Sequence, residues 1–259
     1  MGQMAKPKSP PPANRERGIE RVFHLFAHLH ERRGPIRIAD LPKAIGAPRS
    51  TAYTLVRMLT NAGLLESVDG GSTVYFGKLM HIYGQDYIRE NDLVRRGQEA
   101  AERLARETGE TTELCMLHHD RQAIIHTSQG TRPFRVTSEI GARIPIPWTA
   151  SGRFLLSHLS DDEVHDLLKS EDFVLPDGRK TTLDDFLRDR RKAERDGICV
   201  TKGLITAFTQ CLAAPVRREG RVVATLCFVV PIDVDEARLD ALKTMLKADA
   251  SKLSLPTRA

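Results

Sequence analysis

The sequence predicts an α+β protein of two domains, and three observations support this. From residue 16 to residue 60, apolar residues recur at three- and four-residue steps, which is typical of amphipathic helices. Beyond residue 109, short β-rich runs alternate with helical stretches, which favours an antiparallel sheet covered by helices. Residues 1–83 hold 12 Lys and Arg against 6 Asp and Glu, so the basic charge is concentrated at the start of the chain. A length of 259 residues is enough for two hydrophobic cores.

The chain begins with residues that are poor in apolar side chains. We expect a disordered tail over residues 1–15, because Pro, Lys, Ser and Asn bury too little apolar surface to order a segment. The following periodicity predicts a helix that ends before the Gly-Pro pair at 34–35. A second helix is expected before Gly46, and Pro42 requires it to be short or distorted, since proline is tolerated only in the first turn.

The stretch GAPRSTAYTLVRMLTNAGLL, residues 46–65, predicts a third helix that starts near Pro48 and ends at Gly63. Its apolar stripe would close a small core with the first two helices: Ala52, Leu55, Val56 and Leu59. The opposite stripe is polar, and residues 47–65 contain no Asp or Glu. A solvated helix face usually mixes acids and bases. An acid-free face on a basic segment therefore favours contact with a polyanion.

Two short β-rich segments, 64–67 and 73–76, flank a Gly-Gly turn and predict a hairpin. Three helices followed by a hairpin, with a tight turn between the second and third helices, describe a winged helix-turn-helix, which we place at residues 16–78. In that geometry the third helix enters the major groove of double-stranded DNA. RNA is a weaker candidate because no aromatic-rich strand offers a stacking platform.

The polar stripe of the third helix has the chemistry that a groove requires. Arg reaches phosphates or guanine, Ser and Thr hydroxyls bond phosphates, and Tyr offers a ring and a hydroxyl. The predicted DNA-binding residues are Arg49, Ser50, Thr51, Tyr53, Thr54 and Arg57. The alternative is a basic, solvated surface that has no partner.

The rest of the chain divides into a linker and a second domain. Residues 79–108 are helical in pattern and rich in charge, so we expect one or two linker helices, with a domain boundary near residue 85. The second domain should occupy residues 109–256. Its strand-like runs are ELCMLHH, QAIIHT, FRVTSE, QCLAAPVRR and RVVATLCFVVP, and its helices are expected at 151–159, 161–169, 183–195 and 236–253. The last two strands should pair around a turn at Glu219 and Gly220.

No cofactor, metal or catalytic group is expected. Four widely spaced cysteines fit no metal or disulfide pattern and predict free thiols in a reducing compartment: Cys115, Cys199, Cys211 and Cys227. His118 and His119 are adjacent, so on a strand they would point to opposite faces and share no ion. With neither a run of ~18 apolar residues nor a signal-peptide pattern, we expect a cytoplasmic protein that does not bind membranes.

Catalysis is the rival class of function. Ser151 precedes a glycine, but position 149 is Thr where the nucleophile elbow requires Gly. A small-molecule-processing enzyme with a Ser or Cys nucleophile at Ser151, Cys211 or Cys227 is kept as an alternative. So is a DNA-binding protein that responds to no effector.

The sequence resembles the IclR family of bacterial transcriptional regulators over residues 18 to about 253. Four stretches carry the resemblance through their order and spacing: GAPRSTAYTLVRMLTNAGLL, SEIGARIPIPWTASGRFLLSHL, ERDGICVTKG and CLAAPVRREGRVVATLCFVV. It implies a GAF-like C-terminal domain that binds a small-molecule effector on one side of a curved sheet. It also implies a homodimer or homotetramer that binds a near-palindromic operator and controls a catabolic operon.

The resemblance also implies the effector-binding residues. The effector's anionic group would meet the amides of Ala150 and Ser151, because a helix start exposes unpaired N–H groups. The complete implied set is Trp148, Thr149, Ala150, Ser151, Thr201, Cys211, Cys227 and Val229. Family members that sense small polar acids tend to have an Asp and two Ser where this chain has Thr201, Cys227 and Val229.

This departure predicts the kind of effector. Burying a polar ligand group without a partner costs ~1 to 3 kcal/mol, so a pocket with few polar groups favours an aromatic or similarly apolar carboxylate, with Trp148 stacking on it. The alternatives are that Ser151 only caps a helix and that Cys211 and Cys227 are ordinary core residues.

Overall fold

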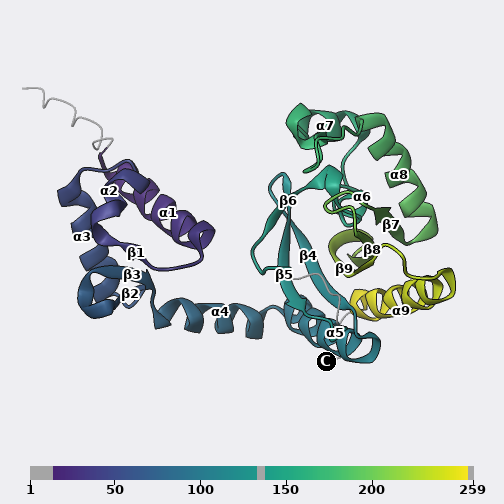
Figure 1. The fold of residues 1–259 in the computed structure, drawn as a ribbon, viewed down its shortest axis with the longest axis horizontal. Helices are drawn as coiled ribbons and strands as arrows, with labels where there is room; N and C mark the ends of the chain where they lie inside the picture. The colour runs from purple at the N-terminus through teal and green to yellow at the C-terminus, as the bar shows by residue number, and fades with distance from the viewer. Residues whose placement is uncertain (1–13, 133–137, 256–259) are drawn as a thin grey trace, which may run out of the picture. The chain divides into compact units, whose positions relative to one another are not determined.

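The structure is a computed structural model that describes residues 14–132 and 138–255 (Figure 1). The chain divides into two compact units, with the division between Glu90 and Asn91. The expected tail lies outside the described residues except for its last two positions, which belong to the first helix. Of the expected strand FRVTSE, only Ser138 and Glu139 are described, and neither is in a strand.

The first unit combines helices with a small antiparallel sheet. Its elements are α1 (Asn14–Arg32), β1 (Ile36–Arg37), α2 (Leu41–Ala44), α3 (Arg49–Asn61), β2 (Leu65–Val68), β3 (Thr73–Phe76) and α4 (Lys78–Glu90). The strand order β1-β3-β2 places the predicted hairpin beside β1, whose Ile36 pairs with Val74. Buried residues from α1, α2, α3 and the sheet form one core, so the expected winged helix-turn-helix is confirmed. A two-residue strand such as β1 is too short for a sequence pattern to reveal.

The turn between α2 and α3 sets the position of the exposed helix. As expected, α2 is short: it has four residues, and Pro42 lies in its first turn. Gly46 follows with a φ of 59°, a left-handed conformation that glycine adopts without steric cost. The chain then enters α3 directly after Pro48.

The segment expected to be a linker consists of two different helices. None of the residues of α4 is buried. The next helix, α5 (Asp92–Thr108), begins where the Asn91 side chain accepts a hydrogen bond from the Val94 amide. A buried stripe that includes Val94, Ala101 and Leu104 packs α5 against the sheet of the second unit. The second half of 79–108 is therefore part of the C-terminal core, because its small and apolar residues recur on one face.

The second unit is built on a six-stranded antiparallel sheet. Its strands are β4 (Thr111–His118), β5 (Arg121–Ser128), β6 (Arg143–Pro145), β7 (Cys199–Lys202), β8 (Thr209–Arg218) and β9 (Arg221–Pro231), in the order β6-β5-β4-β9-β8-β7. The predicted pair β8 and β9 lies inside the sheet and turns at Glu219 and Gly220, both with positive φ.

Helices cover the two faces of the sheet differently (Figure 1). On one face, α5 and α9 (Glu236–Ser254) pack on inward side chains such as Leu212 and Phe228. On the other lie α6 (Gly152–Leu155), α7 (Asp161–Leu167) and α8 (Leu183–Asp196). The helix expected at 151–159 is thus only four residues long, followed by turns. Successive side chains along each strand point to opposite faces of the sheet, so the two faces form separate cores.

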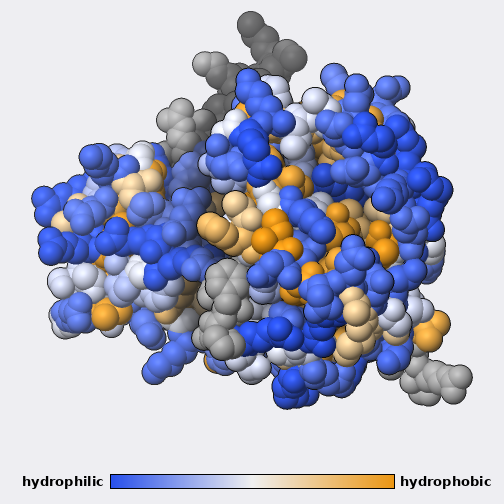
Figure 2. All heavy atoms as spheres, turned by 45° about the vertical axis from the view of Figure 1, so that its right-hand side comes forward, coloured by the Kyte–Doolittle hydropathy of each residue, from blue (hydrophilic) through white to orange (hydrophobic). Residues whose placement is uncertain are grey.

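The surface of the molecule is mostly polar, with apolar side chains gathered on part of one face (Figure 2). Exposed large apolar residues in the second unit include Ile140, Phe208 and Ile232. Among the described residues, no helix has the length and apolar character needed to cross a membrane.

Candidate functional site

The apolar stripe of α3 faces the core and its polar stripe faces solvent, as the sequence predicts. Ala52, Val56 and Leu59 are buried in the first unit's core, and Leu55 packs against it while partly exposed. The predicted DNA-binding residues Arg49, Ser50, Tyr53, Thr54 and Arg57 are exposed, and Thr51 is half-buried. Met58, which the polar stripe did not include, is also exposed. Whether these residues contact DNA stays a prediction.

The exposed face of α3 is organised by two further features. The Arg49 guanidinium carbon lies 5.6 Å from the centre of the Tyr53 ring, within the range of a cation–π contact. A groove beside the helix brings Tyr53, Thr54 and Arg57 together with Asn61 and with Ser67 of β2. The hairpin therefore adds polar groups to the surface that α3 presents.

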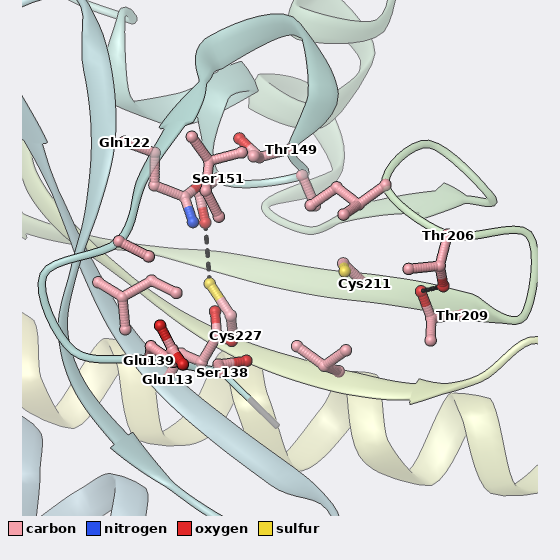
Figure 3. A pocket seen from close by; sticks show the side chains of 16 residues that line it. Glu113, Gln122, Ser138, Glu139, Thr149, Ser151, Thr206, Thr209, Cys211 and Cys227 are labelled. Carbon is pink, nitrogen blue, oxygen red and sulfur yellow. Dashed lines mark hydrogen bonds between the residues drawn. The ribbon is translucent and has the colours of Figure 1, made fainter. Parts of the chain in front are cut away.

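The second unit contains a cavity of about 280 Å³ on the α6 side of its sheet. Most of its wall is apolar, although eight of the lining residues carry a carboxylate, amide or hydroxyl group (Figure 3). The lining residues are Glu113, Gln122, Ile124, Ser138, Glu139, Ala142, Ile144, Thr149, Ala150, Ser151, Ile205, Thr206, Thr209, Cys211, Cys227 and Val229. They come from β4, β5, β8, β9, the start of α6 and the loops around it.

Six of the eight predicted effector-binding residues line this cavity: Thr149, Ala150, Ser151, Cys211, Cys227 and Val229. Antiparallel pairing explains why three distant positions meet there. Cys211 pairs with Val229, and Cys227 lies two residues before Val229, so all three side chains point to one face of the sheet. The Ser151 hydroxyl lies 2.9 Å from the Cys227 sulfur and connects the loop above to the strand below.

Trp148 and Thr201 are not among the residues that line the cavity. Trp148 is therefore not placed to stack on an effector in this cavity, which differs from the expectation from the sequence. The short 3₁₀ turn Ile146–Trp148 directs its indole toward the 3₁₀ helix Ser170–Phe173, where Nε1 donates to the Asp172 carbonyl at 2.7 Å. Thr201 is buried on β7 opposite Cys211, on the edge strand beyond the cavity wall.

The start of α6 is held close to the turn before it. A Cβ atom at position 152 would collide with the carbonyl oxygen of Ile146, so only glycine fits there. The Gly152 amide donates to the Thr149 hydroxyl at 3.0 Å. Ala150 and Ser151 precede the first helical hydrogen bonds of α6, and N–H groups at such positions have no partner within the helix.

Arg153 fixes this turn from below, a role that sequence reasoning missed. Its side chain is buried, and Nη1 donates to the carbonyls of Pro147 and Thr149 at 2.7 and 2.8 Å. Nη2 reaches Asp189 on α8 at 3.4 Å. Because burial is the main influence, the pKa of Arg153 is lowered. Nothing in the sequence around TASGR shows that this arginine turns inward.

Sequence reasoning also missed the acidic end of the cavity. Glu113 is 5% exposed, and burial raises the pKa of its carboxyl group. Gln122 on β5 is 3% exposed. The period-two alternation of ELCMLHH could have revealed Glu113, since it places Glu113 on the same face as Cys115.

The four thiols are buried or half-buried, and two of the histidines lie together at a turn. All four cysteines are free, as expected. Burial raises the pKa of Cys199 to about 11 and also raises that of Cys211, so these thiols stay protonated at neutral pH. His118 and His119 differ from the expectation: the chain turns at His119, where φ is 56°, and the two rings lie 4.5 Å apart. Within the described residues, no three His, Cys, Asp or Glu converge on a metal site.

Comparisons with known proteins agree on one family. The model of the bacterial transcriptional regulator IclR C-terminal domain matches residues 85–255, and that of the IclR helix-turn-helix domain matches residues 18–69. The HTH-type transcriptional regulator KdgR of Escherichia coli is 29% identical over 246 residues, which are 91% of this chain and 90% of that protein.

Solved structures have the same fold. An IclR transcriptional regulator from Alicyclobacillus acidocaldarius superposes with a TM-score of 0.80 at 17% identity, covering 92% of this chain and 97% of that one. An IclR homolog from Microbacterium hydrocarbonoxydans, complexed with 4-hydroxybenzoate, superposes with a TM-score of 0.78 at 23% identity. The superposition covers 92% of this chain and 97% of that one.

The two family models together include the helix α3 and all strands of the C-terminal sheet. The named relatives are transcriptional regulators and not enzymes. The chain therefore belongs to the IclR family of bacterial transcriptional regulators.

Proposed function

We propose that the chain controls a catabolic operon by binding a near-palindromic operator through α3, and that an aromatic or apolar carboxylate in the cavity changes its affinity for that operator. The exposed face of α3, which carries Arg49 and Arg57 without a single acid, is the observation that supports operator binding. Acting on DNA in a bacterial cell places the protein in the cytoplasm.

The effector class is supported by the size and lining of the cavity. About 280 Å³ exceeds the ~150 Å³ that hold a benzene molecule in an engineered protein cavity, so a substituted ring has room. Ile124, Ile144 and Val229 offer apolar surface to such a ring. The amides of Ala150 and Ser151 are our candidates for the acid group. A relative of this fold was crystallised with 4-hydroxybenzoate, which is a ligand of this class.

A homodimer or homotetramer is the assembly we propose. In the first unit, α4 exposes Ile82, Tyr83 and Tyr87, and α1 exposes Ile19 and Phe23. Exposed apolar side chains on a helix such as α4, which has no buried residue, are typical of protein–protein contacts. Two-fold symmetry would then present one α3 helix to each half of the operator.

One experiment tests this function in the full-length protein. DNA sequences that the protein binds are selected from a random pool. The affinity of the protein for the selected DNA is then measured by fluorescence anisotropy with and without benzoate or 4-hydroxybenzoate. We expect a palindromic consensus and a change in affinity when an aromatic acid is added. Recovery of no consensus would contradict operator binding. A consensus whose affinity no aromatic acid alters would leave operator binding intact and remove the proposed effector class.

A further inference from the structure

The polar end of the cavity consists mainly of hydrogen-bond acceptors. Glu113 of β4 lies there beside Ser138 and Glu139, and Gln122 of β5 lies above them next to Ser151 (Figure 3). Both Glu113 and Gln122 are more than nine-tenths buried, so their polar atoms have little access to bulk water. Buried acceptors of this kind need donors, because an unsatisfied polar group is costly away from water.

The donors in this cluster are already engaged. Gln122 Nε2 donates to Cys115 Sγ at 3.3 Å, and Cys115 Sγ donates to Glu113 Oε2 at 3.5 Å. Ser138 also hydrogen-bonds the Glu113 carboxylate. The Gln122 Oε1 atom is buried and has no hydrogen-bond partner within the described part of the chain. The series thus ends in an unpaired amide oxygen and in a carboxylate that accepts from one thiol and one hydroxyl.

Among the described residues, no cationic side chain lines the cavity beside this carboxylate. The described side chains that line the cavity include Glu113 and Glu139 but no Lys, Arg or His. A carboxylate has room for about four hydrogen bonds, and Glu113 receives two from the residues that the structure describes. A donor from a ligand would therefore find a strong, partly vacant acceptor at this point.

We propose that the effector carries a hydroxyl group that donates a hydrogen bond to Glu113, with Gln122 Oε1 as the neighbouring acceptor. This inference rests on the proposed role of the cavity as the effector site, and it names the group that the effector must present there. A hydroxyl fits better than an ammonium group. The remaining wall is largely apolar, with Ile124, Ile144 and Val229, although four Ser and Thr side chains also line it. An ammonium group would lose more hydration than a hydroxyl on entering such a cavity.

Matched probes test this. The dissociation constants of 4-hydroxybenzoate and 4-methylbenzoate are measured by titration calorimetry with the full chain, since the two differ in a donor but hardly in size. The neutral pair 4-hydroxybenzamide and 4-methylbenzamide repeats the comparison without a carboxylate. In each pair whose compounds bind, we expect the hydroxyl compound to have a dissociation constant lower by about 10-fold or more. The reason is that hydrogen bonds to charged groups are stronger than those between neutral groups.

Two variants locate the effect. Glu113→Gln keeps the shape of the side chain and removes its charge, and we expect the hydroxyl preference to fall to about threefold or less. Glu171→Gln is the matched control, because it makes the same change at an exposed position that does not line the cavity. It should leave the hydroxyl preference unchanged. Circular dichroism confirms that both variants are folded.

The outcomes separate this inference from the proposed function. If the compounds bind but the hydroxyl gives no advantage, or if Glu113→Gln keeps the advantage, the inference is overturned while the effector cavity stands. If only the benzamides bind and show the preference, the hydroxyl inference stands, and the proposal that the effector is a carboxylate is wrong. If none of the four binds, both fall. Tighter binding of benzylamine than of benzyl alcohol would replace the hydroxyl with an ammonium group.

Discussion

The Ser151 hydroxyl and the Cys227 sulfur lie 2.9 Å apart and join the start of α6 to the central strand β9 (Figure 3). Both side chains line the cavity, so this hydrogen bond forms part of its wall. It links two segments that are 76 positions apart in the sequence. The geometry of the proposed effector site therefore depends on the packing of α6 as well as on the sheet.

Removing this bond should weaken the C-terminal unit. We expect Ser151→Ala to lower the free energy of unfolding by about 1 kcal/mol, the typical contribution of one buried hydrogen bond. Urea unfolding followed by the fluorescence of Trp148, the single tryptophan of the chain, measures it. Cys227→Ser keeps a donor and an acceptor at the same place and is the control. A loss in Cys227→Ser as large as that in Ser151→Ala would argue against the hydrogen bond.

The two stripes of α3 should respond differently to truncation. Arg57→Ala removes an exposed cation, and we expect operator affinity to fall by about 1 to 3 kcal/mol with unchanged thermal stability. Leu59→Ala empties a buried position and should cost ~2 to 5 kcal/mol of stability. Leu55 is only partly buried, so its truncation should cost less than that of Leu59.

Anisotropy and thermal unfolding measure these two effects. Arg191→Ala removes an exposed arginine from the C-terminal unit and controls for net charge. If Arg191→Ala weakens operator binding as much as Arg57→Ala does, the effect is one of total charge and not of the α3 surface.

Position 152 should tolerate no side chain. Gly152→Ala would push a methyl group into the Ile146 carbonyl, so we expect lower stability and a weaker thermal shift by aromatic acids, as the start of α6 moves. Gly84→Ala is the contrasting control, because Gly84 lies within α4 with open space around it. Helix propensity should make Gly84→Ala neutral or stabilising, by up to ~1 kcal/mol. Differential scanning fluorimetry compares the two; equal stability of both variants would refute the close contact.

Glu113 should make stability depend on pH. Burial raises the pKa of this carboxyl group above its ordinary value of 4.5 in the folded state, so the native protein keeps a proton that the unfolded chain has released. Its contribution to stability is fully present below about pH 4.5 and is lost as pH rises through the native pKa. Glu113→Gln cannot titrate and should lack this loss. Urea unfolding from pH 4 to pH 8 should show the variant gaining stability relative to wild type as pH rises. If the difference in unfolding free energy between the variant and wild type stayed constant from pH 4 to pH 8, the pKa of Glu113 would not be raised.

The exposed face of α4 should govern assembly. Tyr87→Asp places a charge among the exposed apolar side chains of α4, and we expect it to shift the protein toward the monomer because a buried unpaired charge opposes association. Sedimentation velocity measures the change. Gln85→Asp puts the same charge on another exposed position of α4 and should have little effect. An assembly that is unchanged in Tyr87→Asp would place the interface elsewhere.

Local patterns determined much of this protein. The spacing of apolar residues located α1, α3, α8 and α9, and the turn at Glu219 and Gly220 located the β8–β9 pair. The absence of acids in residues 47–65 marked the exposed face of α3. These features depend on neighbours within a few positions, which the sequence records directly.

The tertiary structure decided what distant segments do together. It directed Trp148 toward Asp172 and away from the cavity, and it turned Arg153 inward onto the carbonyls of Pro147 and Thr149. It also brought Glu113 and Gln122 to one end of the cavity through the pairing of β4 with β5. The orientation of a side chain in a short turn, and the burial of a charged group, depend on packing between elements far apart in the chain. No local pattern contains that information.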